Sequence, residues 1–353
     1  MDLKSNNRLH LFPKLNKWVL IFFAAAFIVA GLRGYQLFQY IFAENVKQSG
    51  SITIPKEATF QEVLDSLNAH QILENEKAFR WVAKKKNYPA AIKKGKYVFN
   101  RGMNTNQIVN MLRAGNQKPV TLTFNNLRFI DELAGSIAQR LEPDSIEFLT
   151  YLNDSNVIAA NGFDRYSFHA MFIPNTYEFY WTTTPEQFVE RMHSEYQRFW
   201  NKERLAKAEA LGLTPVQVST VASIVQEETI KADEKPRVAG LYLNRIKRGM
   251  LLQADPTIKF AVGDFSIKRV LNKHLEVDSP YNTYKHAGLP PGPINFPEIS
   301  SIEAVLNAEN HSYLYMCASD EFNGYHNFAR TLREHNKNAR RYQQALNAKK
   351  IWK

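Results

Sequence analysis

The sequence has almost no cysteine and lacks the common metal-ligand signatures. Its only cysteine is Cys317, so no disulfide can form within the chain, and stability must come from packing even if the protein is exported. Cys317 lies in the apolar run 313–318, which predicts a buried strand. No His-Glu-x-x-His sequence is present, and the spacing of His326 and His335 fits no metal motif, so we predict no metal site.

Signatures of nucleic-acid binding are missing as well. No zinc finger, RNP or Walker sequence accompanies the formal net charge of +11. Such a charge would suit nucleic acid, anionic lipid or an acidic polymer as a partner. After residue 50 the basic residues are scattered and flanked by acids, so we predict a role in the cell envelope and no nucleic-acid partner.

Charge is absent from a long stretch near the N-terminus, between Trp18 and Leu32. Apolar residues continue beyond it, so roughly 20 to 25 residues are available, enough for one tilted transmembrane helix over residues 18–43. The preceding residues 1–17 are basic, which places the N-terminus in the cytoplasm and the rest of the chain outside. A cleaved signal peptide is the alternative, although no small-x-small cleavage site stands cleanly after the apolar core. A buried hydrophobic helix is a third interpretation, which fits less well because no regularly spaced polar residues interrupt this apolar stretch.

A strand followed by a helix is predicted three times between residues 51 and 141. The units cover residues 52–67, 97–115 and 121–141. Each unit is too small to bury its own apolar face. We therefore expect them to pack together, with the helix at 79–82, as a small α+β domain, and we expect the third unit to lead into the region that follows.

The strongest helix start in the chain lies at Thr214. Thr214 can act as the N-cap, Pro215 suits the first helical position, and Gln217 can close a capping box. At about 100° per residue, the apolar side chains of this helix form one stripe. Its members are Val218, Val221, Ala222 and Val225, with Ile224 at the edge.

Two adjacent glutamates near the end of this helix are predicted to have different environments. The helical phase places Glu228 at the shoulder of the buried face and Glu227 on the side that faces water. Partial desolvation would raise the pKa of Glu228, as a general acid working near neutral pH requires. The structural alternative is a boundary glutamate paired with Lys231 or Arg237.

The remaining elements of the second half are predicted from periodicity and turn signals. They are a mainly helical region at 142–212, helices at 235–249, 300–307 and 334–350, and strands at 313–318 and 326–330.

The second half of the chain also contains six short motifs. They are VASIVQEET (221–229), VAGLYLNR (238–245), LQADPT (252–257), YNTY (281–284), GLPPG (288–292) and HNF (326–328). In this order they resemble the catalytic core of the MltG (YceG-like) endolytic murein transglycosylase family. The catalytic glutamate of that family maps onto Glu228, the residue that the helical phase selects. An aromatic segment at 171–181 resembles the family too, except that Asn175 stands where an aspartate is common.

This resemblance implies a domain organisation. We expect an α+β protein with a LysM-like α+β domain at 50–118 and a mixed α+β, YceG-like catalytic domain at 119–353. The LysM-like domain would contact glycan, or would serve only as a spacer. The protein would be a single-pass protein of the plasma (inner) membrane, with its catalytic domain periplasmic or extracellular.

The resemblance also implies a reaction. The substrate would be the glycan strands of peptidoglycan, cut between N-acetylmuramic acid and N-acetylglucosamine. Glu228 would protonate the glycosidic oxygen and then take the proton of the C6 hydroxyl, which closes a 1,6-anhydro ring without water or a cofactor. The family's action is endolytic, on nascent strands, and its implied partners are peptidoglycan synthases.

Further residues are predicted to bind the sugar or to orient Glu228. They are Gln253, Asp255, Tyr281, Asn282, Thr283, Tyr177, Glu178 and His326. Gln253 and Asp255 are expected on an irregular segment, and the next three on a stiff, proline-rich loop. Tyr177 would stack on a sugar ring, or would simply belong to the core.

Two other functions fit the same sequence. One is a non-enzymatic, membrane-anchored glycan-binding or scaffold protein. The other is a hydrolytic muramidase, which would need a second carboxylate at a defined separation. Nothing in the sequence marks an obligate partner carboxylate for Glu228.

Overall fold

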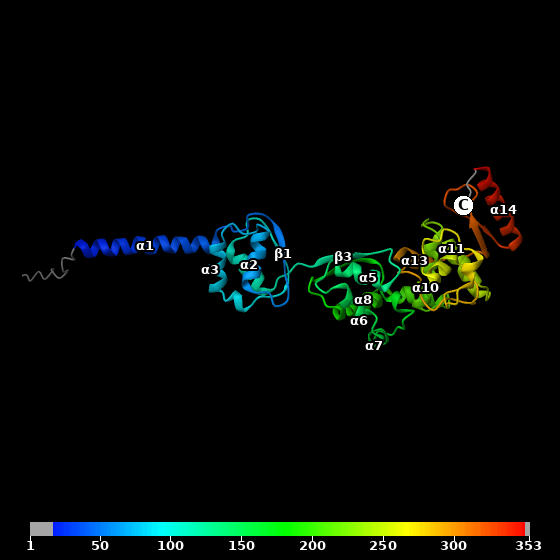
Figure 1. The fold of residues 1–353 in the computed structure, drawn as a ribbon, viewed down its shortest axis with the longest axis horizontal. Coiled ribbons are helices and arrows are strands. Elements are labelled where there is room, and N and C mark those ends of the chain that lie inside the picture. Colours follow the sequence, from blue (N-terminus) through cyan, green and yellow to red (C-terminus); the bar gives the residue numbers. More distant parts are fainter. Residues whose placement is uncertain (1–16, 350–353) are drawn as a thin grey trace, which may run out of the picture. The chain divides into compact units, whose positions relative to one another are not determined.

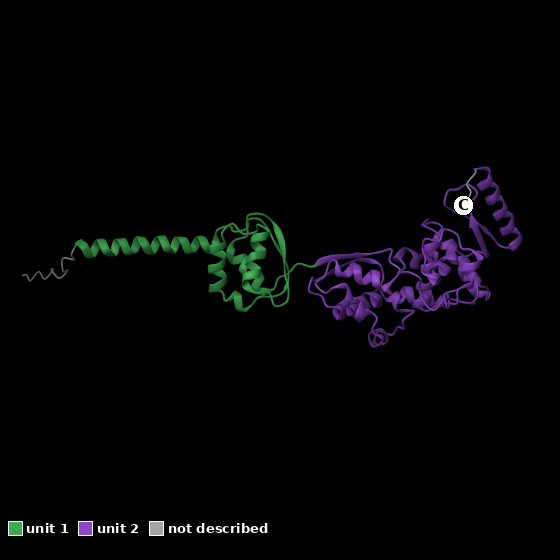
Figure 2. Ribbon diagram, viewed as in Figure 1, with its two compact units in different colours: residues 1–119 green, residues 120–353 purple. Residues whose placement is uncertain are grey.

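The computed structural model describes residues 17–349 (Figure 1). The chain forms two compact units, residues 1–119 and residues 120–353 (Figure 2). The elements are helices and short antiparallel strands, so the fold is mixed α+β.

The first unit begins with the long apolar helix α1, Lys17–Phe42. At 1.5 Å per residue its 26 residues extend about 39 Å, more than the hydrocarbon core of a bilayer. None of its side chains is buried, and its most apolar window has a mean hydropathy of 1.8. By length and composition α1 can therefore cross a membrane.

The rest of the first unit packs helices against one two-stranded sheet. Its elements are β1 Gly50–Ile54, α2 Phe60–Ala69, α3 Glu76–Lys85, η1 Tyr88–Ala90, β2 Gly95–Phe99 and α4 Thr105–Ala114. β1 and β2 are antiparallel, with Ile52 opposite Tyr97. These two side chains share a core with Leu64, Phe79 and Ile108, so the first two predicted strand and helix units do pack together with the predicted helix at 79–82.

The third strand and helix unit does not pack with the first two, contrary to one part of the prediction, but it leads into the region that follows, as the other part expects. It forms β3 Val120–Phe124 and α5 Ile130–Ala138 of the second unit. β3 pairs with β4, Asn175–Phe179, and places Leu122 opposite Tyr177. The apolar face of β3 is covered there by a separate aromatic core, which includes Phe148, Phe172 and Phe188. The helices around this core are α6 Ser145–Leu152, α7 Ser155–Ala160, η2 Phe168–Met171 and α8 Pro185–Phe199.

A second core of this unit surrounds helix α10, Pro215–Glu228. The sequence predicts that α10 is covered along a single apolar stripe. Instead, residues 218–225 are all buried, so this part of the helix is enclosed on every side. Two of its buried hydroxyl side chains bond to the helix backbone: Thr220 donates to the Val216 carbonyl and Ser223 to the Thr220 carbonyl. The surrounding helices are α9 Lys202–Ala210, α11 Lys235–Lys247, α12 Asp255–Val262 and α13 Ile299–Leu306.

The short 3-10 helix η3, Asn272–Glu276, lies between α12 and α13. After α13 the chain forms a hairpin of β5, Tyr315–Ala318, and β6, His326–Ala329, followed by the helix α14, Leu332–Ala348. The predicted helices and strands of this region are present. However, β5 is only partly buried, so the expectation of a buried Cys317 is wrong. One side of this strand is open because it lines a cavity.

Candidate active site

Glu228 is the last residue of α10, and the chain becomes extended at Thr229. The predicted capping box of Thr214 and Gln217 starts the helix and thereby sets its phase. The hydroxyl of Tyr242, on α11, donates a hydrogen bond of 2.6 Å to Oε1 of Glu228. Tyr242 is buried, so the carboxyl group is held in a single orientation.

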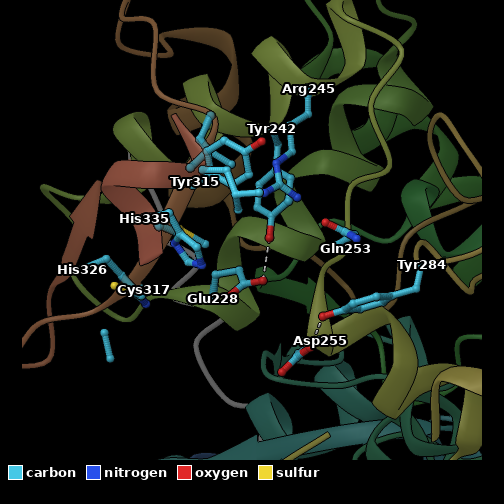
Figure 3. A pocket seen from close by; sticks show the side chains of 14 residues that line it. Glu228, Tyr242, Arg245, Gln253, Asp255, Tyr284, Tyr315, Cys317, His326 and His335 are labelled. Atoms are coloured by element: carbon cyan, nitrogen blue, oxygen red, sulfur yellow. Dashed lines mark hydrogen bonds between the residues drawn. The ribbon is translucent and has the colours of Figure 1, made fainter. Parts of the chain in front are cut away.

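A cavity of about 390 Å³ opens at this carboxyl group. In Figure 3, Glu228 lies between His326, His335 and Cys317 on one side and Gln253, Asp255 and Tyr284 on the other. The volume lies within the range typical of ligand pockets. Its lining residues are Glu228, Leu241, Tyr242, Arg245, Gln253, Asp255, Tyr284, Tyr315, Met316, Cys317, Ala318, His326, Leu332 and His335.

The surroundings raise the pKa of Glu228. Burial is the largest cause, because it disfavours the charged form; the Tyr242 hydrogen bond and the charge on His326 act in the opposite direction, and Asp255 adds to the increase. The position at the C-terminus of a helix also disfavours a negative charge. Burial and the neighbouring Glu228 raise the pKa of Tyr242, so its phenol keeps its proton and remains a donor.

The prediction that Glu227 lies on the side that faces water is only partly correct, because its side chain is 24% exposed and has protein partners. Arg128 lies 3.2 Å from its Oε2, and Asn295 donates to its Oε1 over 2.8 Å. Because the loop between β3 and α5 covers this side of α10, Glu227 is a tethered residue outside the cavity. The alternative partners of Glu228 are engaged elsewhere. Arg237 pairs with Glu309 at 2.9 Å, and Nζ of Lys231 lies over the Tyr325 ring, 4.9 Å from its centroid.

Gln253 and Asp255 both reach the cavity. Gln253 has a φ of 47°, which turns the chain sharply before α12. Asp255 was predicted to lie on an irregular segment, but it is the first residue of that helix. Pro256, at the second helical position, explains the difference, because proline is well tolerated in the first turn of a helix. The hydroxyl of Tyr284 donates to Oδ1 of Asp255 over 2.6 Å.

The signature of the YceG-like family matches residues 52–341. The chain belongs to this family. The endolytic murein transglycosylase of Bacillus subtilis (strain 168) is 28% identical over 318 residues, which are 86% of this chain and 87% of that relative. The endolytic murein transglycosylase of Streptococcus pneumoniae serotype 2 is 27% identical over 342 residues, 86% of this chain but 61% of the relative. A crystal structure of a yceG-like protein from Listeria monocytogenes superimposes with a TM-score of 0.53 at 28% identity, over 82% of this chain and 99% of the other.

In this YceG-like protein the three predicted loop residues Tyr281, Asn282 and Thr283 are buried, and none is among the described residues that line the cavity. Asn282 donates to the carbonyls of Leu275 and Val277, which fixes the loop. Oγ1 of Thr283 accepts from the Ala254 N–H over 3.0 Å, between Gln253 and Asp255. These residues support the cavity wall from behind.

Tyr177 and Glu178 lie on β4, and neither lines the cavity. Tyr177 is buried, and its hydroxyl donates to the Ile173 carbonyl over 2.6 Å. Glu178 is exposed on the other face of the strand. Of the two interpretations of Tyr177, the structure therefore agrees with the one that places it in the core. Neither Tyr177 nor Glu178 lies in the cavity with Glu228.

Sequence reasoning missed several residues of this YceG-like site. Tyr242, Arg245 and Tyr284 stand inside the quoted motifs but received no role there. Arg245 is buried and donates to the carbonyls of Leu314 and Leu252, so it joins the hairpin to the segment before Gln253. No local signal marks these contacts, because each links segments that only the fold brings together.

His326 is held by a residue outside the motifs, Glu234. Oε1 of Glu234 accepts from the His326 backbone N–H over 2.7 Å, and Oε2 lies 2.9 Å from Nδ1 of the ring. Glu234 is buried, whereas His326 lines the cavity. Among residues 17–349, no three His, Cys, Asp or Glu side chains are grouped so that they could hold a metal ion.

Proposed function

We propose that this protein is a membrane-anchored lytic transglycosylase that cleaves the bond between N-acetylmuramic acid and N-acetylglucosamine in peptidoglycan and leaves 1,6-anhydro ends. One observation carries the proposal: a carboxyl group with a raised pKa, fixed by Tyr242, lies in a cavity large enough for sugar residues. The names of the relatives, endolytic murein transglycosylases, support the same reaction and endolytic action.

The cavity offers the groups that such a reaction needs. Glu228 is protonated more readily than an ordinary glutamate, so it can donate its proton to the glycosidic oxygen. The exposed carboxylate of Asp255, opposite Glu228 in Figure 3, is suited to stabilise the positive charge of an oxocarbenium-like state. Ring closure then needs only the C6 hydroxyl of the substrate, and the family resemblance implies that Glu228 accepts the proton of that hydroxyl.

Digestion of purified sacculi tests the proposal. Wild-type protein should release muropeptides with anhydro ends, detected by mass spectrometry, and Glu228→Gln should release none. Glu190→Gln, which replaces an exposed glutamate on α8 outside the cavity, is the matched control and should act like wild type. Undigested sacculi with wild-type protein would contradict the proposal and would favour a glycan-binding or scaffold protein instead.

A hydrolytic muramidase is the second candidate, because Glu228 and Asp255 share one cavity and hydrolysis uses two carboxylates. The two reactions differ in their products. Hydrolysis leaves reducing ends, whereas the lytic reaction leaves none. The ratio of the two kinds of ends in the same digest therefore decides between them.

We also infer the domain roles and the location in the cell. Helix α1, which covers residues 18–42 of the predicted span 18–43, would anchor the protein in the plasma (inner) membrane with the N-terminus in the cytoplasm, supported by its length and its lack of buried side chains. Residues 50–118 would form the LysM-like, glycan-contacting domain, and residues 119–353 the catalytic domain, outside the cytoplasm. The enzyme would act on nascent strands beside peptidoglycan synthases.

Two experiments test these assignments. Protease added to intact spheroplasts should degrade the chain after α1. Deletion of residues 51–118 should weaken sacculus binding while cleavage persists.

A further inference from the structure

The first unit carries a group of lysines that the proposed reaction does not use. Residues 76–96 contain seven lysines and one arginine but a single acid, Glu76. Glu76 is paired with Arg80 at 2.5 Å, so its charge is already balanced. Such an excess of one sign on a small unit creates a positive potential that attracts an anionic partner.

Helix α3 gathers three of these lysines on one face. Its buried residues are Ala78, Phe79, Val82 and Ala83. At about 100° per residue, Lys77, Trp81 and Lys84 lie on the opposite face, with Lys85 at its edge. Nζ of Lys85 lies 5.9 Å from the centroid of the Trp81 ring. In the part of the chain that the structure describes, none of the three lysines is paired with a carboxylate, so their charges face outward uncompensated.

This basic face of α3 lies beside the end of the apolar helix α1. The rings of Tyr40 and Trp81 meet edge to face, with their centroids 6.3 Å apart. In Figure 1, α3 lies at the edge of the first unit where α1 enters it. Along α1, Trp18 and Tyr40 are about 33 Å apart, slightly more than the hydrocarbon core of a bilayer. When α1 spans a bilayer from Trp18 onward, Tyr40 and Trp81 therefore lie at the far interface, where both residue types are favoured.

The lysines are close enough to this interface to meet the lipid headgroups. Side chains three or four positions apart on a helix are about 5–6 Å apart, so Lys77, Lys84 and Lys85 all neighbour Trp81. A lysine side chain also extends its charge well beyond its apolar stem. The three ammonium groups thus come within about one Debye length, about 10 Å, of the headgroups at the level of Tyr40.

The place of the basic face favours a membrane over a soluble anionic partner. Carboxylates of peptidoglycan peptides would also attract lysines. However, a bilayer is present at this face whenever α1 is inserted, and a polymer would have to displace it from the same space. An aromatic ring among lysines on the outer face of a helix is also typical of helices that lie in the interface.

We propose that α3 docks on the anionic phospholipid headgroups of the leaflet from which α1 emerges. Lys77, Lys84 and Lys85 bind the phosphates, and Trp81 lies at the level of the headgroups. The first unit then rests on the membrane surface and does not hang freely from α1. Each lysine strengthens the contact about fivefold, so the three together contribute about 100-fold. The inference rests on the proposed anchoring by α1 and is independent of the proposed reaction.

Acetylation of lysines tests the docking with the full-length protein. The protein is placed in nanodiscs of phosphatidylcholine, alone or mixed with phosphatidylglycerol, and reaction with a water-soluble reagent is followed at each lysine by mass spectrometry. Lys77, Lys84 and Lys85 should react at least about fivefold more slowly in the anionic nanodiscs, and high salt should remove the difference. Lys202, exposed on α9 of the second unit, is the internal control and should react equally in both.

Two results of this experiment overturn the inference. One is an equal rate at the three lysines in neutral and anionic nanodiscs. The other is protection by soluble peptidoglycan fragments in neutral nanodiscs without protection by phosphatidylglycerol, which would assign the basic face to the cell wall. Wild-type protein that fails to copurify with nanodiscs would refute the anchoring by α1 itself, and the docking with it.

A charge variant tests the same contact through Trp81. Its fluorescence is the difference between a protein and its Trp81→Phe counterpart, and brominated phospholipid in anionic nanodiscs should quench it. The combined change Lys77→Gln, Lys84→Gln and Lys85→Gln should abolish this quenching, while α1 still holds the protein in the nanodisc. The matched control removes three exposed lysines of the second unit and should keep the quenching: Lys202→Gln, Lys247→Gln and Lys337→Gln. Quenching that survives the change on α3 contradicts the role of its lysines.

Discussion

The hydroxyl of Tyr242, within α11, donates a hydrogen bond of 2.6 Å to Oε1 of Glu228, the last residue of α10. The phenol stabilises the carboxylate form and so opposes the rise in pKa that burial causes. It also leaves Oε2 as the oxygen that can face a substrate. If Glu228 is the acid, as proposed, this hydrogen bond affects both the orientation of the acid and the pH at which it works.

Removal of this hydrogen bond should shift the pH profile. In Tyr242→Phe the pKa of Glu228 rises further, because the carboxylate loses a donor while burial remains. An acid must be protonated to act, so activity is lost as pH rises through its pKa, and the alkaline limb of kcat should move to higher pH. We also expect kcat to fall by about tenfold, since the carboxyl group is no longer held. Tyr313→Phe, outside the cavity, is the control and should leave the limb in place.

The same carboxyl group should make stability depend on pH. Its folded-state pKa lies above the unfolded value near 4.5, so its contribution is fully present below about pH 4.5 and is lost as pH rises through the folded pKa. Glu228→Gln is neutral at every pH. Its melting temperature should therefore equal that of wild type at low pH and exceed it at neutral and alkaline pH. A variant that is less stable than wild type at pH 8 would show that the carboxylate is not disfavoured in the fold.

Local patterns predicted the capping of α10 and the position of Glu228 on it, because capping and helical phase depend on residues a few positions apart. They did not predict the partners that define the site. Tyr242 is 14 residues from Glu228, and Glu234 is 92 residues from His326. Glu227 follows the same rule: its phase alone indicates an exposed side chain, but the loop carrying Arg128 comes from 99 residues earlier in the chain.

The contacts of Glu227 predict a graded loss of stability. Glu227→Ala removes the acceptor of Arg128 and leaves the Asn295 amide only its 3.5 Å contact with the Ser223 carbonyl, so it should reduce the free energy of unfolding by about 1–3 kcal/mol. Glu227→Gln keeps an oxygen for the Asn295 amide and should lose less. Chemical denaturation of both variants measures the difference. Equal losses would mean that only the ion pair with Arg128 contributes, and neither variant should abolish cleavage, because Glu227 lies outside the cavity.

Gly292, in the GLPPG motif, should tolerate no side chain. A Cβ at this position would overlap the backbone carbonyl of Tyr166, which cannot move aside as a flexible side chain could. Gly292→Ala must therefore displace either the loop that leads to Ile294, whose N–H bonds to Ser223 of α10, or the segment at Tyr166. We expect a lower melting temperature together with lower activity, because α10 also carries Glu228.

Gly135→Ala is the matched control: nothing lies within 4 Å of its Cβ, and alanine favours the helix α5, so it should stabilise the protein by about 0.5–1 kcal/mol. If Gly292→Ala proved as stable as wild type, the close approach of these two backbone segments would not be a constraint of the fold.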